Sequence, residues 1–253
     1  MIKENGITYL DETVYNYFCN EQGSRNLYRY MDYSKMKKGK LWFSNPSTWN
    51  DPYEKLFLYS TYLKRRNVGI EYPLLNRVFC ICLTSISLSE AAWKVYNCAT
   101  KFSIDTEKMR QVLSESAKDF DVYIGKVNYK DKKYLKENGI LKLTDSPSFD
   151  CFLSNDAWVK LLLLKRLEFQ SEEEICIILV PKENIKTPKD GINLNFTTPM
   201  RELFHHVELS PFLYSLEEEQ VKMRLISRFG FSFDQISVSD LYKPVEVRKL
   251  RMY

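Results

Sequence analysis

Two stretches of the chain are apolar at nearly every position, and they limit the fold more than any other feature. They are Phe79 to Thr84 and Ile175 to Val180. An almost unbroken apolar run of this length is typical of a strand that is buried on both faces of a sheet. The sequence therefore predicts a largely buried central sheet that is flanked by helices.

The remaining helical and strand patterns interleave along the chain without strict alternation. Helices are predicted at 11–19, 54–65, 71–78, 88–98, 105–118, 150–167 and 215–228, and further strands at 27–31, 41–44, 101–104, 121–129, 191–196, 204–209 and 236–238. Ser87 with Glu90, and Ser215 with Glu218, have the spacing of capping boxes, and Asp105 is predicted to cap another helix. No linker or internal repeat divides the 253 residues, so we predict one mixed α+β domain over residues 1–253.

Charge and cysteine content narrow the functional classes only a little. A formal net charge of +4 over 253 residues does not require a nucleic-acid partner, although short basic clusters occur. The six cysteines lack the spacing of a zinc ligand set and indicate reduced thiols in a cytoplasmic protein. No apolar run is long enough to span a bilayer, and the N-terminus has no signal-peptide pattern. We expect neither a metal nor a membrane partner.

Several common enzyme motifs are missing from the sequence. The eight glycines are dispersed, so neither a phosphate-binding loop nor a dinucleotide fingerprint is present. His205 and His206 point to opposite faces of a predicted strand, and neither has a nearby Asp or Ser motif for triad chemistry. A kinase, a P-loop ATPase and a Rossmann dehydrogenase are therefore not expected.

The segment from Leu41 to Glu54 combines a short strand with a loop that is rich in special-purpose residues. Its prolines restrict the backbone, and its Asn and Asp side chains favour local turns. We predict that the Asp51 carboxylate accepts backbone hydrogen bonds within its own turn and that Asn50 is largely buried. We also predict that Trp42 and Trp49 bury large areas. The loop is either a rigid plug at the end of the sheet or the wall of a site that includes Asn50, Asp51 and Glu54.

Two sets of charged residues adjoin the apolar strands, and each has two explanations. Arg29 lies within a predicted strand, where it either pairs with a carboxylate on a neighbouring strand or binds an anionic ligand. The run Glu172 to Glu174 is either a solvated turn or part of a site that contains a cation or a substrate, because three adjacent carboxylates repel one another. In an extended chain, Glu172 and Glu174 share one face.

Several stretches together form a pattern over most of the chain. They are Leu27-Tyr28-Arg29-Tyr30, Leu41-Trp42-Phe43-Ser44, Asn50-Asp51-Pro52-Tyr53-Glu54, Phe79-Cys80 with Trp93 and Tyr96, Lys165 with Glu172 and Glu174, and His206-Val207-Glu208-Leu209 with Ile236-Ser237-Val238. This pattern resembles the bacterial family known as domain of unknown function 2971. The family usually has an arginine where this chain has Cys176, and different neighbours around Tyr96. The family has no settled activity, so this resemblance implies no function.

The order of the landmarks also resembles that of ADP-ribosyltransferases, which place an Arg or His on a first strand, a hydroxyl cluster or Tyr on a second element and a Glu on a late strand. The resemblance implies NAD as the substrate, with Glu174, Glu172 and Tyr96 as catalytic residues. It implies that the cofactor-binding residues are Arg29, Tyr30, Thr84, Ser85 and Trp93. Such a carboxylate would offset the positive charge that develops on the ribose as nicotinamide leaves, and Arg29 would hold phosphate. Tyr30 departs from the pattern, because these enzymes often have Gly there.

Three functional hypotheses follow, and we favour the first. The first is an NAD-consuming ADP-ribosyltransferase or NAD glycohydrolase, acting as a toxin or antiphage effector on an unknown protein or nucleic-acid acceptor. The second is a non-catalytic protein-interaction module that uses the aromatic loop. The third is a nucleic-acid-binding protein or metal-dependent nuclease, in which Asp51, Glu54, Glu172 and Glu174 would converge. For Trp93 and Tyr96, a role in the core is the alternative to a role in a site.

Overall fold

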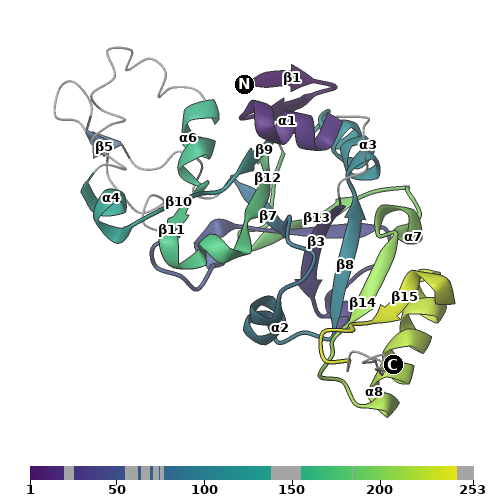
Figure 1. Cartoon of the computed structure of the whole chain (residues 1–253). Helices are drawn as coiled ribbons and strands as arrows, with labels where there is room; N and C mark the ends of the chain where they lie inside the picture. Colours follow the sequence, from purple (N-terminus) through teal and green to yellow (C-terminus); the bar gives the residue numbers. More distant parts are fainter. Residues whose placement is uncertain are drawn as a thin grey trace, which may run out of the picture.

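The computed structural model describes residues 1–19, 26–54, 62–63, 69–70, 74, 77–137, 155–183 and 185–243. Its centre is a mixed sheet of 11 strands, which gives the protein an α+β fold (Figure 1). Nine strands follow one path, in the order β1 (Ile2–Glu4), β2 (Ile7–Tyr9), β9 (Phe120–Lys126), β12 (Glu174–Pro181), β7 (Phe79–Thr84), β3 (Asn26–Met31), β8 (Thr100–Asp105), β14 (His206–Leu209) and β15 (Ile236–Val238). Two more, β4 (Lys40–Ser44) and β13 (Gly191–Asn195), pair with each other, and β4 also pairs with β7.

The two apolar runs form neighbouring strands at the centre of the sheet. β7 and β12 are antiparallel, and their register runs from Glu174 opposite Thr84 to Leu179 opposite Phe79. Every residue of β12 is buried. Alternate residues enter two different core clusters, so that Ile177 packs on one face of the sheet and Ile178 on the other. The predicted common sheet, covered on both faces, is confirmed.

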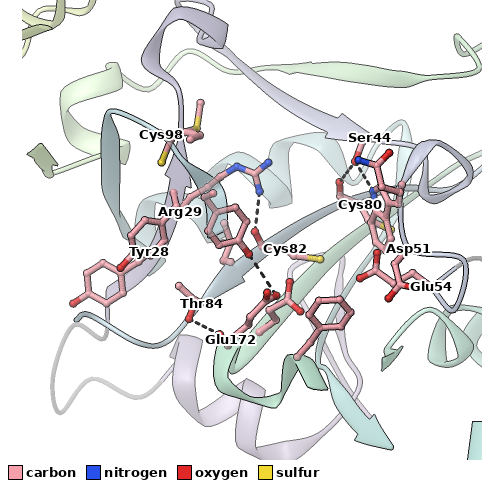
Figure 2. Close-up of a pocket in the computed structure, with 18 of the residues that line it drawn as sticks. Tyr28, Arg29, Ser44, Asp51, Glu54, Cys80, Cys82, Thr84, Cys98 and Glu172 are labelled. Atoms are coloured by element: carbon pink, nitrogen blue, oxygen red, sulfur yellow. Dashed lines mark hydrogen bonds between the residues drawn. The ribbon is translucent and has the colours of Figure 1, made fainter. Parts of the chain in front are cut away.

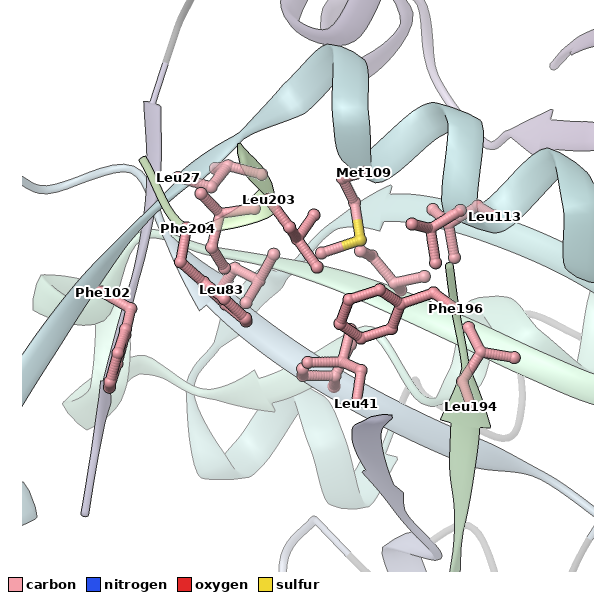
Figure 3. Packing of buried hydrophobic residues seen from close by; sticks show 14 of the residues in the cluster. Leu27, Leu41, Leu83, Phe102, Met109, Leu113, Leu194, Phe196, Leu203 and Phe204 are labelled. Atoms are coloured by element: carbon pink, nitrogen blue, oxygen red, sulfur yellow. The ribbon is translucent and has the colours of Figure 1, made fainter. Parts of the chain in front are cut away.

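One face of the sheet is covered mainly by α1 (Glu12–Cys19), α3 (Thr106–Ser116) and α7 (Met200–Leu203), with α8 (Ser215–Arg224) near β14 and β15 at one edge. Figure 3 shows Met109 and Leu113 of α3 pointing toward Phe196, with Leu41 of β4 beneath it. Packing of this kind removes large apolar areas from water and supplies most of the driving force for folding.

The other face carries a smaller cluster beneath α6 (Asn155–Leu161). Trp158 and Val159 of this helix pack over Cys176 and Ile178 of β12. Beside it, β10 (Asn128–Lys130) and β11 (Leu164–Arg166) pair as a separate parallel ribbon, followed by the 3₁₀ helix Leu167–Glu172. The remaining elements are α2 (Glu90–Tyr96), α4 (Lys132–Glu137), β5 (Tyr62–Leu63), β6 (Gly69–Ile70), the 3₁₀ helices Tyr33–Lys35, Pro46–Thr48 and Phe233–Gln235, and the π-helix Leu225–Phe229. Across the described ranges, the helices are all too short or too polar to cross a membrane.

The long helix predicted at 150–167 is wrong over its second half. The helix α6 ends at Leu161, and the chain then turns into the strand β11. A tertiary contact explains the difference, because Lys165 forms ion pairs with two carboxylates, Glu54 and Glu174, from the strand β11 and not from a helix. Residues 150–154, and most of the helices predicted at 54–65 and 71–78, lie outside the described residues. The helix predicted at 54–65 is wrong at Tyr62–Leu63, which form the strand β5.

Two predicted caps are displaced by one or two residues. Ser89, and not Ser87, caps α2, because its Oγ accepts the Ala92 N–H at 3.1 Å while the carbonyl of Ser87 accepts a bond from Lys101. At α8 the box uses Tyr214 and Glu217 in place of Ser215 and Glu218. The predicted cap at Asp105 is confirmed, since its Oδ1 accepts the Lys108 N–H at 2.9 Å.

Two predicted strands are shorter than expected. The strand predicted at 204–209 begins only at His206, because the 4-residue helix α7 reaches Leu203. The strand predicted at 121–129 is divided at Val127 into β9 and β10, which belong to different sheets. The N–H of Val127 donates to the carbonyl of Glu174, and this bond marks the point where the chain leaves the large sheet.

Candidate functional site

The central strand β7 shares one of its edges between two strands that diverge. Tyr28 of β3 pairs with Thr84, near one end of β7, and Ser44 of β4 pairs with Cys80, near the other end. We call the gap between these two pairs the fork. At the fork, the carbonyl of Cys82 accepts a hydrogen bond of 2.8 Å from Nη1 of Arg29 (Figure 2). An arginine side chain thus takes the place of a strand.

A cavity of about 740 Å³ opens at the fork. Its walls come from β3, the loop after β4, β7, α2, β11 and the start of β12. In Figure 2, Arg29 and Glu172 approach from one side, and Asp51 and Glu54 lie across from them. The predicted site residues that line the cavity are Arg29, Tyr30, Thr84, Tyr96, Glu172, Glu174, Asn50, Asp51 and Glu54.

Arg29 contributes a positive charge that a backbone carbonyl holds in place, and it forms no ion pair with a carboxylate among the residues that the structure describes. Its guanidinium donates to the neutral carbonyl of Cys82, so a backbone contact stands where a carboxylate partner was the alternative prediction. Burial lowers the pKa of the Arg29 guanidinium from its ordinary value, and nearby acidic groups such as Cys82 and Tyr96 act in the opposite direction. A guanidinium that binds only a carbonyl keeps its full charge available to an anion in the cavity.

Glu174 is held by a buried cation that the sequence had not placed at the site. Nζ of Lys165 lies 2.8 Å from Oε2 of Glu174 and 2.7 Å from Oε1 of Glu54. The hydroxyl of Tyr129 donates to Oε2 of Glu174 at 3.3 Å and accepts the Glu174 N–H at 2.9 Å. Burial acts to lower the pKa of Lys165, but the acidic groups of Cys82, Glu174 and Glu54 outweigh it and hold this pKa well above its ordinary value. These contacts fix the position of the Glu174 carboxylate.

Glu172 is the less constrained of the two predicted catalytic carboxylates. It is half-buried, and burial together with the Glu174 carboxylate raises its pKa from 4.5 to about 7. The hydroxyl of Tyr96 lies 3.4 Å from its Oε2, and the Tyr96 ring stacks on Tyr30 with centroids 5.7 Å apart. A carboxyl with a pKa near 7 can accept or donate a proton at neutral pH.

The route by which Glu172 and Glu174 reach the cavity differs from the prediction. Glu172 ends a 3₁₀ helix, Glu173 has a left-handed backbone with φ of 41°, and β12 begins only at Glu174. The two carboxylates therefore line one cavity because the chain turns between them, and the extended chain that we predicted is wrong. The hydroxyl of Thr84 fixes this turn by donating to the carbonyl of Glu172 at 2.5 Å.

The loop after β4 confirms one prediction and corrects two. The Asp51 carboxylate accepts the N–H of Tyr53 at 2.9 Å, as predicted, and also binds Nε of Arg166 at 2.9 Å. Asn50 is exposed, and the Trp42 side chain is 44% exposed. The predicted burial of both residues is therefore wrong. The buried amide is Asn45, which is 0% exposed and caps the 3₁₀ helix that follows.

Two predicted cofactor-binding residues do not line the cavity. Trp93 is 2% exposed and packs edge-on against Tyr30, which places it in the core behind the wall. The hydroxyl of Ser85 contacts Glu173 on the outside of the turn. Lys165, Trp49 and Phe169 line the cavity although they were not predicted as site residues. The available signal was a lysine that directly follows the apolar run Leu161 to Leu164, because a buried cation needs carboxylates.

Metal binding has no support among the residues that the structure describes. They contain no group of three or more His, Cys, Asp or Glu side chains arranged to hold a metal ion. Asp51, Glu54 and Glu174 already contact Arg166 or Lys165. The five cysteines that the structure describes are free.

Comparisons with known proteins give no further assignment. No model of a known protein family matches the chain, and neither a curated protein nor a solved structure matches it. The two resemblances drawn from the sequence therefore remain predictions, and any function must be argued from the cavity.

Proposed function

We propose that the protein consumes NAD, as an ADP-ribosyltransferase or NAD glycohydrolase with a fold of that type. The observation that supports this most is that Arg29, Tyr96, Glu172 and Glu174 line one cavity although they come from three distant parts of the chain. The cavity volume of about 740 Å³ lies within the range of small-molecule sites, roughly 300–1,000 Å³.

Each of these side chains has a role in such a reaction. The bond between ribose C1 and the nicotinamide nitrogen breaks, and its electron pair leaves with nicotinamide. Positive charge then develops on the ribose, where the fixed Glu174 carboxylate offsets it. Arg29 binds the phosphates of NAD through its guanidinium donors. Tyr96 contributes an aromatic face beside the nicotinamide.

The ion-paired group of Glu54, Glu174 and Lys165 still favours a positively charged ribose in the cavity. Glu54 and Glu174 are two carboxylates that share the one ammonium group of Lys165. When both are ionised, the three groups carry a net charge of −1 in a water-poor wall, where such a charge acts more strongly than in water. Lys165 thus positions Glu174 without cancelling the whole negative charge.

Glu172 takes the proton from the nucleophile that attacks ribose C1. Its pKa of about 7 suits a general base at neutral pH. When water is the nucleophile the reaction is NAD hydrolysis, and when a protein or nucleic-acid group attacks, ADP-ribose is transferred to it. A toxin or antiphage effector acting in the cytoplasm is the biological setting that we infer for either reaction.

Nicotinamide release tests this function. The purified protein is incubated with NAD carrying a label on the adenylate, alone and with protein or nucleic-acid acceptors. Free nicotinamide and labelled acceptor are then measured. We expect Arg29→Ala to raise KM for NAD about 10- to 100-fold, as for the loss of one charge-assisted hydrogen bond, and Arg29→Lys to restore only part of it.

Arg201→Ala is the matched control, because Arg201 is exposed on α7 and lies outside the cavity wall. It should leave KM unchanged. The absence of nicotinamide release with every acceptor, in protein that is folded, would overturn the proposal and favour a non-catalytic interaction module. The alternative of a metal-dependent nuclease has less support, because Lys165 and Arg166 already occupy the carboxylates that a metal would need.

A further inference from the structure

Three thiols lie together on the β7–β12 strand pair, below the cavity. Cys80 and Cys82 are two residues apart on β7 and so point to the same face. Cys176 of β12 lies directly opposite Cys82 in the antiparallel register. The Sγ atoms of Cys82 and Cys176 are 3.3 Å apart. The proposed NAD chemistry uses none of these thiols.

The Cys82–Cys176 pair meets the geometric conditions for a disulfide. Directly opposed residues in antiparallel strands have Cα atoms about 4.5 or 5.5 Å apart, and disulfides span Cα separations of roughly 4.4–6.8 Å. The Sγ atoms need to approach by only about 1.3 Å to reach the usual S–S bond length of about 2.05 Å. Rotation of the two side chains can supply this shift while the strands keep their register.

The pair is also within reach of a small reagent. Cys82 is half-buried and lines the cavity, whereas Cys176 is 1% exposed behind it. Contact with the Cys176 thiol and burial raise the pKa of Cys82 well above its ordinary value, and contact with the Cys80 thiol and burial do the same to the pKa of Cys176, while the ammonium group of Lys165 acts to lower both. An oxidant that enters the cavity therefore meets Cys82 first, and reaction is slow compared with that of an exposed thiolate.

We propose that Cys82 and Cys176 form a redox modification site, in which a small peroxide converts the two thiols into a cross-strand disulfide. The Cys82 thiol gives up its proton, and its thiolate attacks one oxygen of hydrogen peroxide. The O–O bond breaks, and the departing hydroxide takes up that proton, which gives a sulfenic acid and one water molecule. The sulfur of Cys176 then attacks the Cys82 sulfur, and the hydroxyl group leaves with a proton as a second water. Two thiols are oxidised, and one peroxide is reduced.

The modification acts at the fork itself. Cys82 supplies the carbonyl that holds Arg29, and it lies between the points where β3 and β4 join β7. A covalent bond between Cys82 and Cys176 ties this part of β7 to β12. The inference does not depend on the proposed NAD reaction, because it follows from the register and the thiol positions alone.

Peptide mapping tests the proposal on the full chain. The protein is treated with hydrogen peroxide, its remaining thiols are alkylated, and it is digested without reductant for mass spectrometry. We expect a Cys82–Cys176 cross-link that is lost after treatment with dithiothreitol. The cross-link should be absent from Cys82→Ser and Cys176→Ala but present in Cys80→Ser.

Cys98→Ser is the matched control, because Cys98 also lines the cavity while its Sγ donates to the carbonyl of Thr100. This variant should form the cross-link at the wild-type rate. A Cys80–Cys176 cross-link in its place would overturn the assignment. So would oxidation confined to Cys19 and Cys98, with Cys82 and Cys176 still fully alkylated. Because wild-type and Cys98→Ser protein decide these outcomes, a folding defect in Cys176→Ala leaves the test valid.

Discussion

Replacement of Glu172 by glutamine should change how the stability of the protein depends on pH. Burial, followed by the Glu174 carboxylate, raises the pKa of Glu172 from 4.5 to about 7. One pKa unit corresponds to about 1.4 kcal/mol, so the ionised form of Glu172 costs the fold at most roughly 3 kcal/mol. Because neighbouring charges titrate together with Glu172, we expect a measured effect of about 1–3 kcal/mol.

The sign follows from the raised pKa of Glu172. Below its unfolded-state pKa of 4.5, the carboxyl is protonated in both states, and its favourable contribution to stability is fully present. As the pH rises through about 7, the unfolded chain binds fewer protons than the folded one, and this contribution is lost. Glutamine stays neutral throughout, so Glu172→Gln avoids the loss above pH 7.

Urea unfolding of wild-type and Glu172→Gln protein at several pH values between about 4 and 8 measures the effect. The variant should become more stable relative to wild type as the pH rises, by about 1–3 kcal/mol over this range. Glu173→Gln is the control, because Glu173 is exposed in the same turn, and its stability should follow that of wild type. Parallel pH profiles for Glu172→Gln and wild type would refute the reasoning.

The same contacts lead to four further predictions. Asp51→Ala should lower the free energy of unfolding by about 1–3 kcal/mol, measured by urea titration, since it leaves a backbone N–H and an arginine without their acceptor. Lys165→Met should lower the free energy of unfolding by about 3–5 kcal/mol near pH 8 and by less near pH 5, because Glu54 and Glu174 are left unpaired until they protonate. Gly191→Ala should lower the melting temperature, because a Cβ there would lie 2.4 Å from the Trp42 ring and 2.5 Å from the backbone carbonyl of Phe43. Nicotinamide release should rise with pH through about 7 in wild type, and this rise should vanish in Glu172→Gln.

The central sheet was predictable because its evidence is local. An apolar run such as Phe79 to Thr84 is stable only as a strand in a sheet whose two faces are both covered. The structure forms this strand with residues in both core clusters. Strand ends and caps were less predictable, because they depend on partners far along the chain. Ser87 has the spacing of a cap, but Lys101 binds its carbonyl and the helix starts after Ser89.

The members of the site were more predictable than its geometry. Arg29, Tyr96, Glu172 and Glu174 were predicted from the resemblance of their order to that of ADP-ribosyltransferases, and they line one cavity. The fork was not predictable, because it arises where two distant strands divide one edge of β7 between them. The ion pairs of the buried Lys165 with Glu54 and Glu174 were missed for the same reason. Lys165 and Glu54 are more than 100 residues apart in the chain.

The most direct test of the proposed function is the rate of nicotinamide release by Glu174→Gln beside wild type. Glutamine keeps the shape of the side chain but removes the charge that offsets the ribosyl cation, so the rate should fall about 10²- to 10³-fold. Glu173→Gln, which alters an exposed carboxylate outside the cavity wall, should leave the rate unchanged. Equal rates for Glu174→Gln and wild type, in folded protein that releases nicotinamide, would contradict the assignment of Glu174 as the stabilising carboxylate.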